Sequence, residues 1–248
     1  MGSLFSTSPN CPVLPEQNNG GMAITRQTFD DFYERLYREI EVYTTNPSYD
    51  KMQQEAAEFY DIDWLLAKAV RIKESHDNPY LISNVGAVGL MQLMPREGSW
   101  TTSSHENYLK ARKKSLRNAE RTYEQKSYLE WGETYQDDLE SIVSSSPKDE
   151  LYKKDLRFDP EWNIGEGTRE LAYNIGFLRK NGFDQKTLFV AGQERPAYLV
   201  LAVAAYNAGL GTVLDGNIPK NPQTSQYVPE VFALYDLLKE KKQRGKEE

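Results

Sequence analysis

The stretch DIDWLLAKAVRIKES, residues 61–75, carries the pattern that decides the fold. Its apolar residues lie around much of the circumference of the helix that it predicts, and a helix of that kind is buried in a core. Asn78-Pro79 is expected to end this helix, because the residue before a proline disfavours helical geometry. The sequence therefore places one carboxylate, that of Glu74, at the C-terminal end of a buried helix.

Most of the remaining chain also shows helical periodicity. Apolar residues recur at spacings of three and four over residues 28–43, 49–60, 163–180, 195–207 and 225–242. We expect Ser48 to cap the second of these helices, Gly182 to end the third, and a short helix to form around 89–94. Because no stretch alternates as a half-buried strand does, the sequence predicts an all-α, predominantly helical fold.

Two segments differ from this pattern. Residues 1–25 are rich in Ser, Pro, Asn and Gly and predict a flexible N-terminal arm. Residues 96–157 are rich in charges, Ser and Tyr, and they predict a helical insertion of two amphipathic helices. A disordered loop is the alternative for this second segment. The apolar positions that favour helices are Leu116, Ala119, Tyr123, Tyr135, Leu139 and Ile142.

Composition excludes several classes of function. With 30 Lys and Arg against 37 Asp and Glu, the net charge of -7 disfavours nucleic acid as a partner. One cysteine and two histidines exclude an intrachain disulfide and leave too few ligands for a structural zinc. No phosphate-binding loop is visible, so we expect neither a metal nor a cofactor. No apolar stretch is long enough to span a membrane, and the first thirty residues do not form a signal peptide.

Three short segments, in a fixed order, carry the functional pattern. They are Glu74-Ser75, GAVGLMQ at residues 86–92 and AYNAG at residues 205–209. Together they resemble the soluble-type lytic murein transglycosylases, the lysozyme-like glycoside hydrolase family 23. The resemblance covers about residues 61–95 and 158–240. It implies a lysozyme-like catalytic domain over residues 26–95 and 158–248, interrupted by the insertion at 96–157.

This resemblance implies an enzyme that cuts the glycan strands of bacterial peptidoglycan. In the family, a single glutamate first protonates the oxygen of the β-1,4 bond between N-acetylmuramic acid and N-acetylglucosamine. The resulting carboxylate then takes a proton from the C6 hydroxyl of the same muramoyl sugar, which gives a 1,6-anhydro product without water. The resemblance assigns this catalytic role to Glu74. Without it, the ordinary interpretation of Glu74 is a solvated carboxylate or one paired with Arg71 or Lys73.

The resemblance also implies a substrate-binding set around Glu74. Its members are Ser75, Ser83, Gly89, Met91, Gln92, Tyr206, Asn207 and Tyr227. The amide of Gln92 offers a donor and an acceptor, as sugar N-acetyl and hydroxyl groups require, although an ordinary surface amide is the alternative. Met91 is also interpreted as a packing residue and Asn207 as a helix cap. Tyr206 and Tyr227 are expected to flank the carboxyl group of Glu74, and two core aromatics are the alternative.

One residue near Glu74 departs from the family. The family usually has an aromatic three positions after the glutamate, where this chain has Asp77. If the helix continues, Asp77 and Glu74 share a face and repel each other. The favoured alternative is that Asp77 caps the turn beside Asn78.

The leading prediction is thus a peptidoglycan lytic transglycosylase. A lysozyme-type hydrolase of the same bond is the alternative among enzymes, and a catalytically idle glycan-binding or scaffold protein is the alternative of another class. We expect a location in the periplasm or cell envelope, although no signal sequence is present in this chain. The insertion at 96–157 is expected to offer a surface to a cell-envelope protein partner.

Overall fold

The computed structural model describes residues 46–84, 86–94, 140–141, 143–153 and 155–244. The predicted arm at 1–25, the predicted helix at 28–43 and most of the predicted insertion lie outside these residues. The six apolar positions on which the insertion's helices depend are outside them as well. The domain boundaries therefore stay a prediction.

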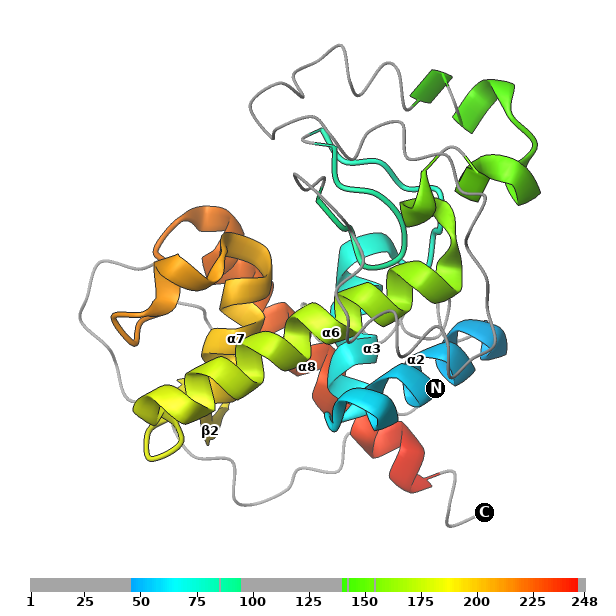
Figure 1. Cartoon of the computed structure of the whole chain (residues 1–248). Coiled ribbons are helices and arrows are strands. Elements are labelled where there is room, and N and C mark those ends of the chain that lie inside the picture. Colours follow the sequence, from blue (N-terminus) through cyan, green and yellow to red (C-terminus); the bar gives the residue numbers. More distant parts are fainter. Residues whose placement is uncertain (1–45, 85, 95–139, 142, 154, 245–248) are drawn as a thin grey trace, which may run out of the picture.

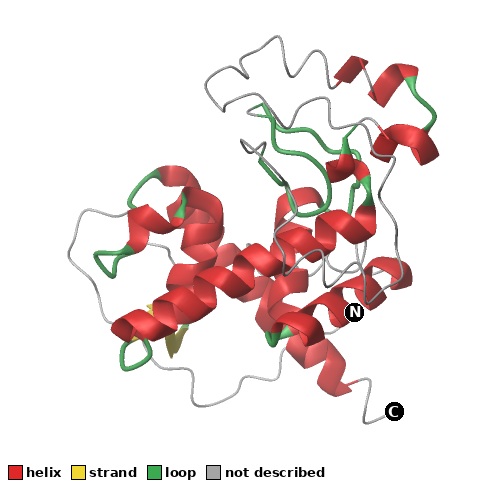
Figure 2. Cartoon of the chain, viewed as in Figure 1, coloured by secondary structure: helices red, strands yellow, loops and turns green. Residues whose placement is uncertain are grey.

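Helices dominate the described residues, which confirms the predicted fold class (Figure 2). The α-helices are α2 (Pro47–Tyr60), α3 (Trp64–Ser75), α6 (Pro160–Leu178), α7 (Ala197–Ala208) and α8 (Pro222–Arg244). Shorter helical turns are η2 (Lys148–Lys153), η3 (Leu156–Phe158), η4 (Arg179–Phe183) and η5 (Leu210–Val213). Two short strands, β1 (Thr187–Val190) and β2 (Gln193–Pro196), form an antiparallel hairpin between η4 and α7.

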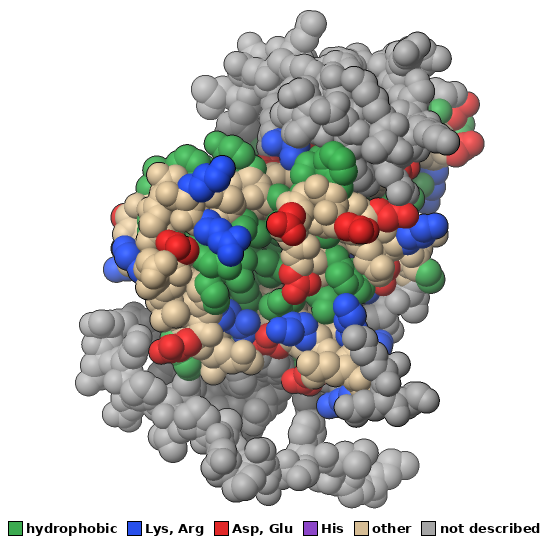
Figure 3. All heavy atoms as spheres, turned by 60° about the horizontal axis from the view of Figure 1, so that its bottom comes forward, with side chains coloured by type: hydrophobic (Ala, Val, Ile, Leu, Met, Phe, Trp, Pro, Cys, Tyr) green, Lys and Arg blue, Asp and Glu red, His purple; other side chains and the backbone are tan. Residues whose placement is uncertain are grey.

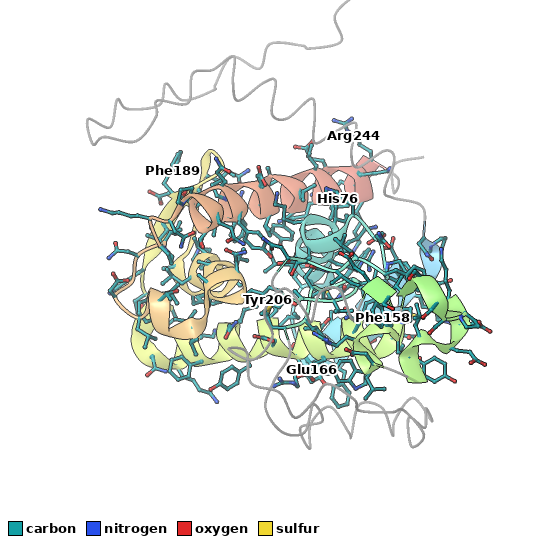
Figure 4. All side chains as sticks on the ribbon, turned by 90° about the horizontal axis from the view of Figure 1, so that it is seen from above. His76, Phe158, Glu166, Phe189, Tyr206 and Arg244 are labelled. Carbon is teal, nitrogen blue, oxygen red and sulfur yellow. The ribbon has the colours of Figure 1, made fainter. Side chains whose placement is uncertain are left out.

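The long helix α6 organises the arrangement of the others. It crosses the molecule, with α7 at one end and α2 and α3 toward the other (Figure 1). Seen from above, α6 and α8 lie on opposite sides, and α3 and α7 lie between them (Figure 4). The apolar faces of these helices form one core, to which α3 and α7 contribute almost all of their length. Burial of this continuous apolar surface is the main stabilising contribution to the fold.

Capping side chains set the helix starts, and these differ from the predicted ones. Ser48 does not cap α2, because Asn46 accepts a hydrogen bond from the Ser48 amide at 3.2 Å and Pro47 is the first helical residue. The helix predicted over residues 61–75 begins at Trp64, because the side chain of Asp63 accepts from the Leu65 amide at 2.9 Å. In the same way Asp159 starts α6 three residues before the predicted position.

Two further predictions of local structure were wrong. Residues 89–94 form turns and isolated β-bridges instead of a short helix, because Gly89 and Gln92 have φ angles of 82° and 46°, which no right-handed helix accommodates. The helix predicted over residues 195–207 begins at Ala197, and Arg195 belongs to the hairpin strand β2. No strand had been predicted, since each strand is only four residues long and its burial does not alternate cleanly.

Candidate active site

Glu74 lies in the last turn of α3 and faces α8. Its carboxyl group is partly buried, and the hydroxyl of Tyr227 on α8 donates a hydrogen bond to Oε1 at 2.5 Å. Tyr227 itself is only 5% exposed, so core packing fixes its ring and the hydroxyl that it presents. The structure thus brings together two predicted site residues that are 153 positions apart in the sequence.

Burial raises the pKa of Glu74 from 4.5 to about 7. The hydrogen bond from Tyr227 and the positive charge of Lys73 oppose this rise, whereas the carboxylate of Glu170 adds to it. Burial and the neighbouring Glu74 also raise the pKa of Tyr227 well above its ordinary value, so its hydroxyl keeps its proton. Near neutral pH, Glu74 can therefore both give and accept a proton, which is what a general acid and base requires.

The basic residues beside Glu74 in sequence pair with other carboxylates. Lys73 forms an ion pair with Glu230 on α8. Arg71 is fully buried and binds Asp50 and Asp77, with its Nε at 2.8 Å from Oδ1 of Asp77. The ion pair with Glu74 that was one of the ordinary interpretations of this glutamate is therefore not the arrangement that the structure shows for Arg71 or Lys73.

The turn after Glu74 differs from both alternatives considered for Asp77. The helix ends at Ser75, and His76 and Asp77 follow with φ angles of 51° and 59°, so Asp77 does not continue the face of Glu74. Asn78, and not Asp77, caps the next turn by accepting from the Tyr80 amide at 3.0 Å. Asp77 instead anchors this turn to Arg71, which keeps the end of α3 in a fixed position.

The loop of residues 81–84 and 86–93 follows this turn, and two of its polar side chains bind its own backbone. Ser83 accepts a hydrogen bond from the Ala87 amide at 3.0 Å. The side-chain amide of Gln92 donates to the carbonyl oxygens of Leu81 and Gly89 at 3.1 and 2.9 Å. The donor that we expected to meet a sugar is thus used to close the loop.

Ser75 and Met91, two other members of the predicted set, are buried. Ser75 is 1% exposed, and its hydroxyl donates to the carbonyl oxygen of Arg71 at 3.3 Å. Met91 is fully buried, in agreement with its interpretation as a packing residue. Their side chains belong to the core next to the site and are not accessible to a ligand.

The AYNAG segment at the end of α7 contacts the loop and α8. Tyr206, labelled in Figure 4, donates its hydroxyl hydrogen to the carbonyl oxygen of Met91 at 2.8 Å, so this hydrogen is not available to the carboxylate of Glu74. Asn207 accepts a hydrogen bond from the hydroxyl of Thr224 at 2.8 Å, and it thereby joins the end of α7 to the start of α8. Of the two predicted flanking tyrosines, only Tyr227 donates to Glu74 through a contact that the structure shows.

Two buried residues that were not predicted hold the loop in place. Arg157, 1% exposed, donates to the carbonyl oxygens of Gly86 and Leu93 at 2.7 and 3.1 Å. Asn163 is fully buried on α6 and binds the loop backbone as well. In the sequence, each is a polar residue between two apolar neighbours. This pattern could have indicated a buried polar side chain that needs hydrogen-bond partners.

Charged side chains of both signs are interspersed on the face drawn in Figure 3.

Over the part of the chain that the structure describes, no group of three or more His, Cys, Asp or Glu could hold a metal ion. Among the same residues, no helix is long and apolar enough to cross a membrane.

Residues 51–130 match the family model described as "Transglycosylase SLT domain". This part of the chain is similar to transglycosylase SLT domains. The match includes Glu74 and the loop at 86–92, and it ends before Tyr206 and Tyr227. It also extends into the predicted insertion.

A curated protein to which this chain is similar is the "Membrane-bound lytic murein transglycosylase F" of Desulfosudis oleivorans. It is 32% identical to this chain over 79 residues, which are 27% of this chain and 17% of the relative. The chain thus spans about a sixth of the length of the curated relative that it matches. Both comparisons confirm the resemblance to lytic transglycosylases.

Proposed function

We propose that this chain is a peptidoglycan lytic transglycosylase with Glu74 as its only acid and base. The observation that carries the proposal is the hydrogen-bonded pair of Glu74 and Tyr227, in which the partly buried carboxyl group has a pKa of about 7 and a fixed hydrogen-bond donor. The SLT domain match supports the substrate class, and the relative's printed name refers to murein. The bond cleaved is the β-1,4 bond between N-acetylmuramic acid and N-acetylglucosamine.

In the first step, protonated Glu74 gives its proton to the glycosidic oxygen as the bond to C1 of the muramic acid breaks. Positive charge then develops at C1, and the N-acetyl group of the same sugar stabilises it. In this step the Tyr227 hydroxyl stabilises the negative charge that appears on Glu74, because a hydrogen bond to a charged acceptor is stronger than one to a neutral acceptor.

In the second step, the Glu74 carboxylate removes the proton from the C6 hydroxyl, and the C6 oxygen bonds to C1. The product is a 1,6-anhydro-muramoyl end, and Glu74 is protonated again, so no water is consumed. We propose that Tyr227, which donates to Oε1 of Glu74, keeps this hydrogen bond in both steps and so holds the carboxyl group in one orientation while the proton moves. A group with a pKa near the working pH suits both proton transfers.

The remaining predicted residues are proposed to shape the glycan site around this pair. Ser83, Gly89 and Gln92 fix the loop that follows α3, and Asn207 fixes the end of α7 against α8. The buried side chains of Ser75 and Met91 contribute by packing in the core next to the site. We propose action in the periplasm or cell envelope, where the substrate lies.

A lysozyme-type hydrolase of the same bond is the second candidate, because one observation favours it. Glu170 on α6 is close enough to raise the pKa of Glu74, so a second carboxylate is present near the acid. Hydrolases of glycosidic bonds ordinarily use two carboxylates, one of which activates water or attacks the sugar. We propose Glu170 as that second group if the bond is hydrolysed, because its charge acts on Glu74.

Digestion of purified sacculi, followed by mass spectrometry of the products, tests the proposal. The wild-type protein is expected to release muropeptides with anhydro ends. The Glu74→Gln variant should lose about two orders of magnitude of activity or more. Glu240→Gln, which changes an exposed glutamate on α8, is the matched control and should remain active. Reducing ends from the wild type would favour the hydrolase, and near-normal activity of Glu74→Gln would contradict the assignment of the acid.

A further inference from the structure

The peptide groups of Met91 are held at both ends by side chains from two different helices. The amide of Met91 donates to Oδ1 of Asn163 on α6 at 2.7 Å. The carbonyl oxygen of Met91 accepts from the hydroxyl of Tyr206 on α7 at 2.8 Å. A loop residue held in this way cannot shift without breaking a buried hydrogen bond.

Asn163 uses both sides of its amide for this purpose. It is fully buried, and its Nδ2 donates to the carbonyl oxygens of Val88 and Arg157 at 2.9 and 2.8 Å. Gly89 packs closely against this amide. A Cβ at Gly89 would clash with Nδ2 of Asn163 and would lie 2.5 Å from the carbonyl oxygen of Arg157. One side chain therefore joins α6, the η3 turn and two positions of the loop.

One turn after Asn163, the absence of a side chain at Gly167 on α6 leaves room for Met91 of the loop. A Cβ at Gly167 would lie 2.5 Å from Cβ of Met91 and 2.9 Å from the hydroxyl oxygen of Tyr206. Asn163 and Gly167 are four residues apart and so lie on the same face of the helix. This face therefore contacts the loop twice, through the hydrogen bonds of Asn163 and through the close packing of Gly167 against Met91.

We propose that Asn163 is the positioning residue of the glycan-binding loop, acting through the backbone of Met91 and, beyond it, Tyr206. Asn163 holds the loop at a fixed distance from Glu74 without touching the substrate. Tyr206 acts on the same residue, because its hydroxyl donates to the carbonyl oxygen of Met91. This inference rests on the proposed function.

The test compares Asn163→Ala with Thr168→Ala. Thr168 is also fully buried on α6 and also loses buried hydrogen bonds when truncated, but it faces Gln53 on α2 and not the loop. Both variants should be less stable than the wild type. With a soluble glycan substrate, only Asn163→Ala should lose kcat/KM, by up to about a hundredfold, because a loop misplaced by about 1 Å costs that much.

Three further readouts separate positioning from general damage. The pH at which activity falls should stay unchanged in Asn163→Ala, since its contacts do not include Glu74 or Tyr227. Hydrogen exchange of the Met91 amide should speed up in Asn163→Ala and not in Thr168→Ala. Tyr206→Phe should reproduce the loss of kcat/KM, and combining it with Asn163→Ala should add little, because both act on one residue.

If Asn163→Ala does not fold, Tyr206→Phe alone decides the matter, since it keeps the ring. Equal losses of kcat/KM in Asn163→Ala and Thr168→Ala would overturn the inference. So would unchanged kcat/KM in Tyr206→Phe, or a shifted pH profile in Asn163→Ala. In each of these cases an active wild type would leave the proposed function standing, whereas a wild type that does not cleave glycan would overturn both.

Discussion

Replacing Glu74 by glutamine is expected to stabilise the protein above neutral pH, although it removes the proposed acid. Burial raises the pKa of this carboxyl group from 4.5 to about 7, so the folded state holds the proton more tightly than the unfolded chain does. The stability that this proton contributes is fully present below pH 4.5 and is lost as the pH rises through 7. Glutamine does not titrate, and its amide oxygen can still accept from Tyr227.

The size of the effect follows from the two pKa values. One pKa unit corresponds to about 1.4 kcal/mol, so the rise from 4.5 to about 7 corresponds to about 3 kcal/mol. Between about pH 4.5 and pH 8, the free energy of unfolding of Glu74→Gln should therefore gain about 3 kcal/mol on that of the wild type. The other carboxyl groups contribute equally to both proteins and cancel in the difference.

Urea unfolding at several pH values, followed by circular dichroism, measures this difference. Glu240→Gln is the control, because it makes the same chemical change at an exposed position. A Glu74→Gln difference that is independent of pH would contradict the raised pKa of Glu74. A wild type that gains stability relative to the variant as the pH rises would contradict it as well.

Three more changes near Glu74 have expected outcomes. Tyr227→Phe removes a hydrogen bond worth roughly 1.5–3 kcal/mol to the carboxylate, so kcat/KM should fall about tenfold to a hundredfold and the pH at which activity is lost should rise. Glu230→Gln removes the ion-pair partner of Lys73, whose charge then lowers the pKa of Glu74, so a pH–rate profile should show activity lost at a lower pH. Gly89→Ala forces a side chain into a φ of 82° and into a clash with its neighbours, so urea unfolding should show destabilisation by more than the roughly 1–3 kcal/mol of backbone strain alone.

Each of these expectations has its own contrary outcome. An unchanged pH profile in Tyr227→Phe would mean that the hydroxyl does not stabilise the carboxylate. A profile of Glu230→Gln that moves toward higher pH would contradict the proposed effect of Lys73. Gly182→Ala is the control for Gly89, because Gly182 has a φ of 85° and open space around it, and equal destabilisation of the two variants would rule out the clash.

The helices could be predicted from the sequence because their apolar spacing is local information. α3, α7 and α8 were found within a few residues, and the errors lie at their ends. Those ends depend on single side chains such as Asp63 and Asp159, which accept backbone hydrogen bonds that periodicity does not reveal. The turns at Gly89 and Gln92 depend on positive φ angles in the same way.

The site could be predicted only where the chain resembles the lytic transglycosylases. Tyr227 could be placed beside Glu74 only through the family, because no local pattern links residues so far apart in the sequence. The partners of Gln92 and Tyr206 could not be predicted, since both bind backbone carbonyl oxygens whose positions depend on the folded loop. Asn163 was missed for the same reason.

In the proposed reaction, Glu74 works alone and the C6 hydroxyl of the sugar replaces water. Glycan cleavage in water enriched in oxygen-18, with mass spectrometry of the new muramoyl ends, tests this claim most directly. We expect ends that lack one molecule of water relative to reducing ends and carry no label. Reducing ends that carry the heavy isotope would contradict it and would favour hydrolysis with Glu170 as the second carboxylate.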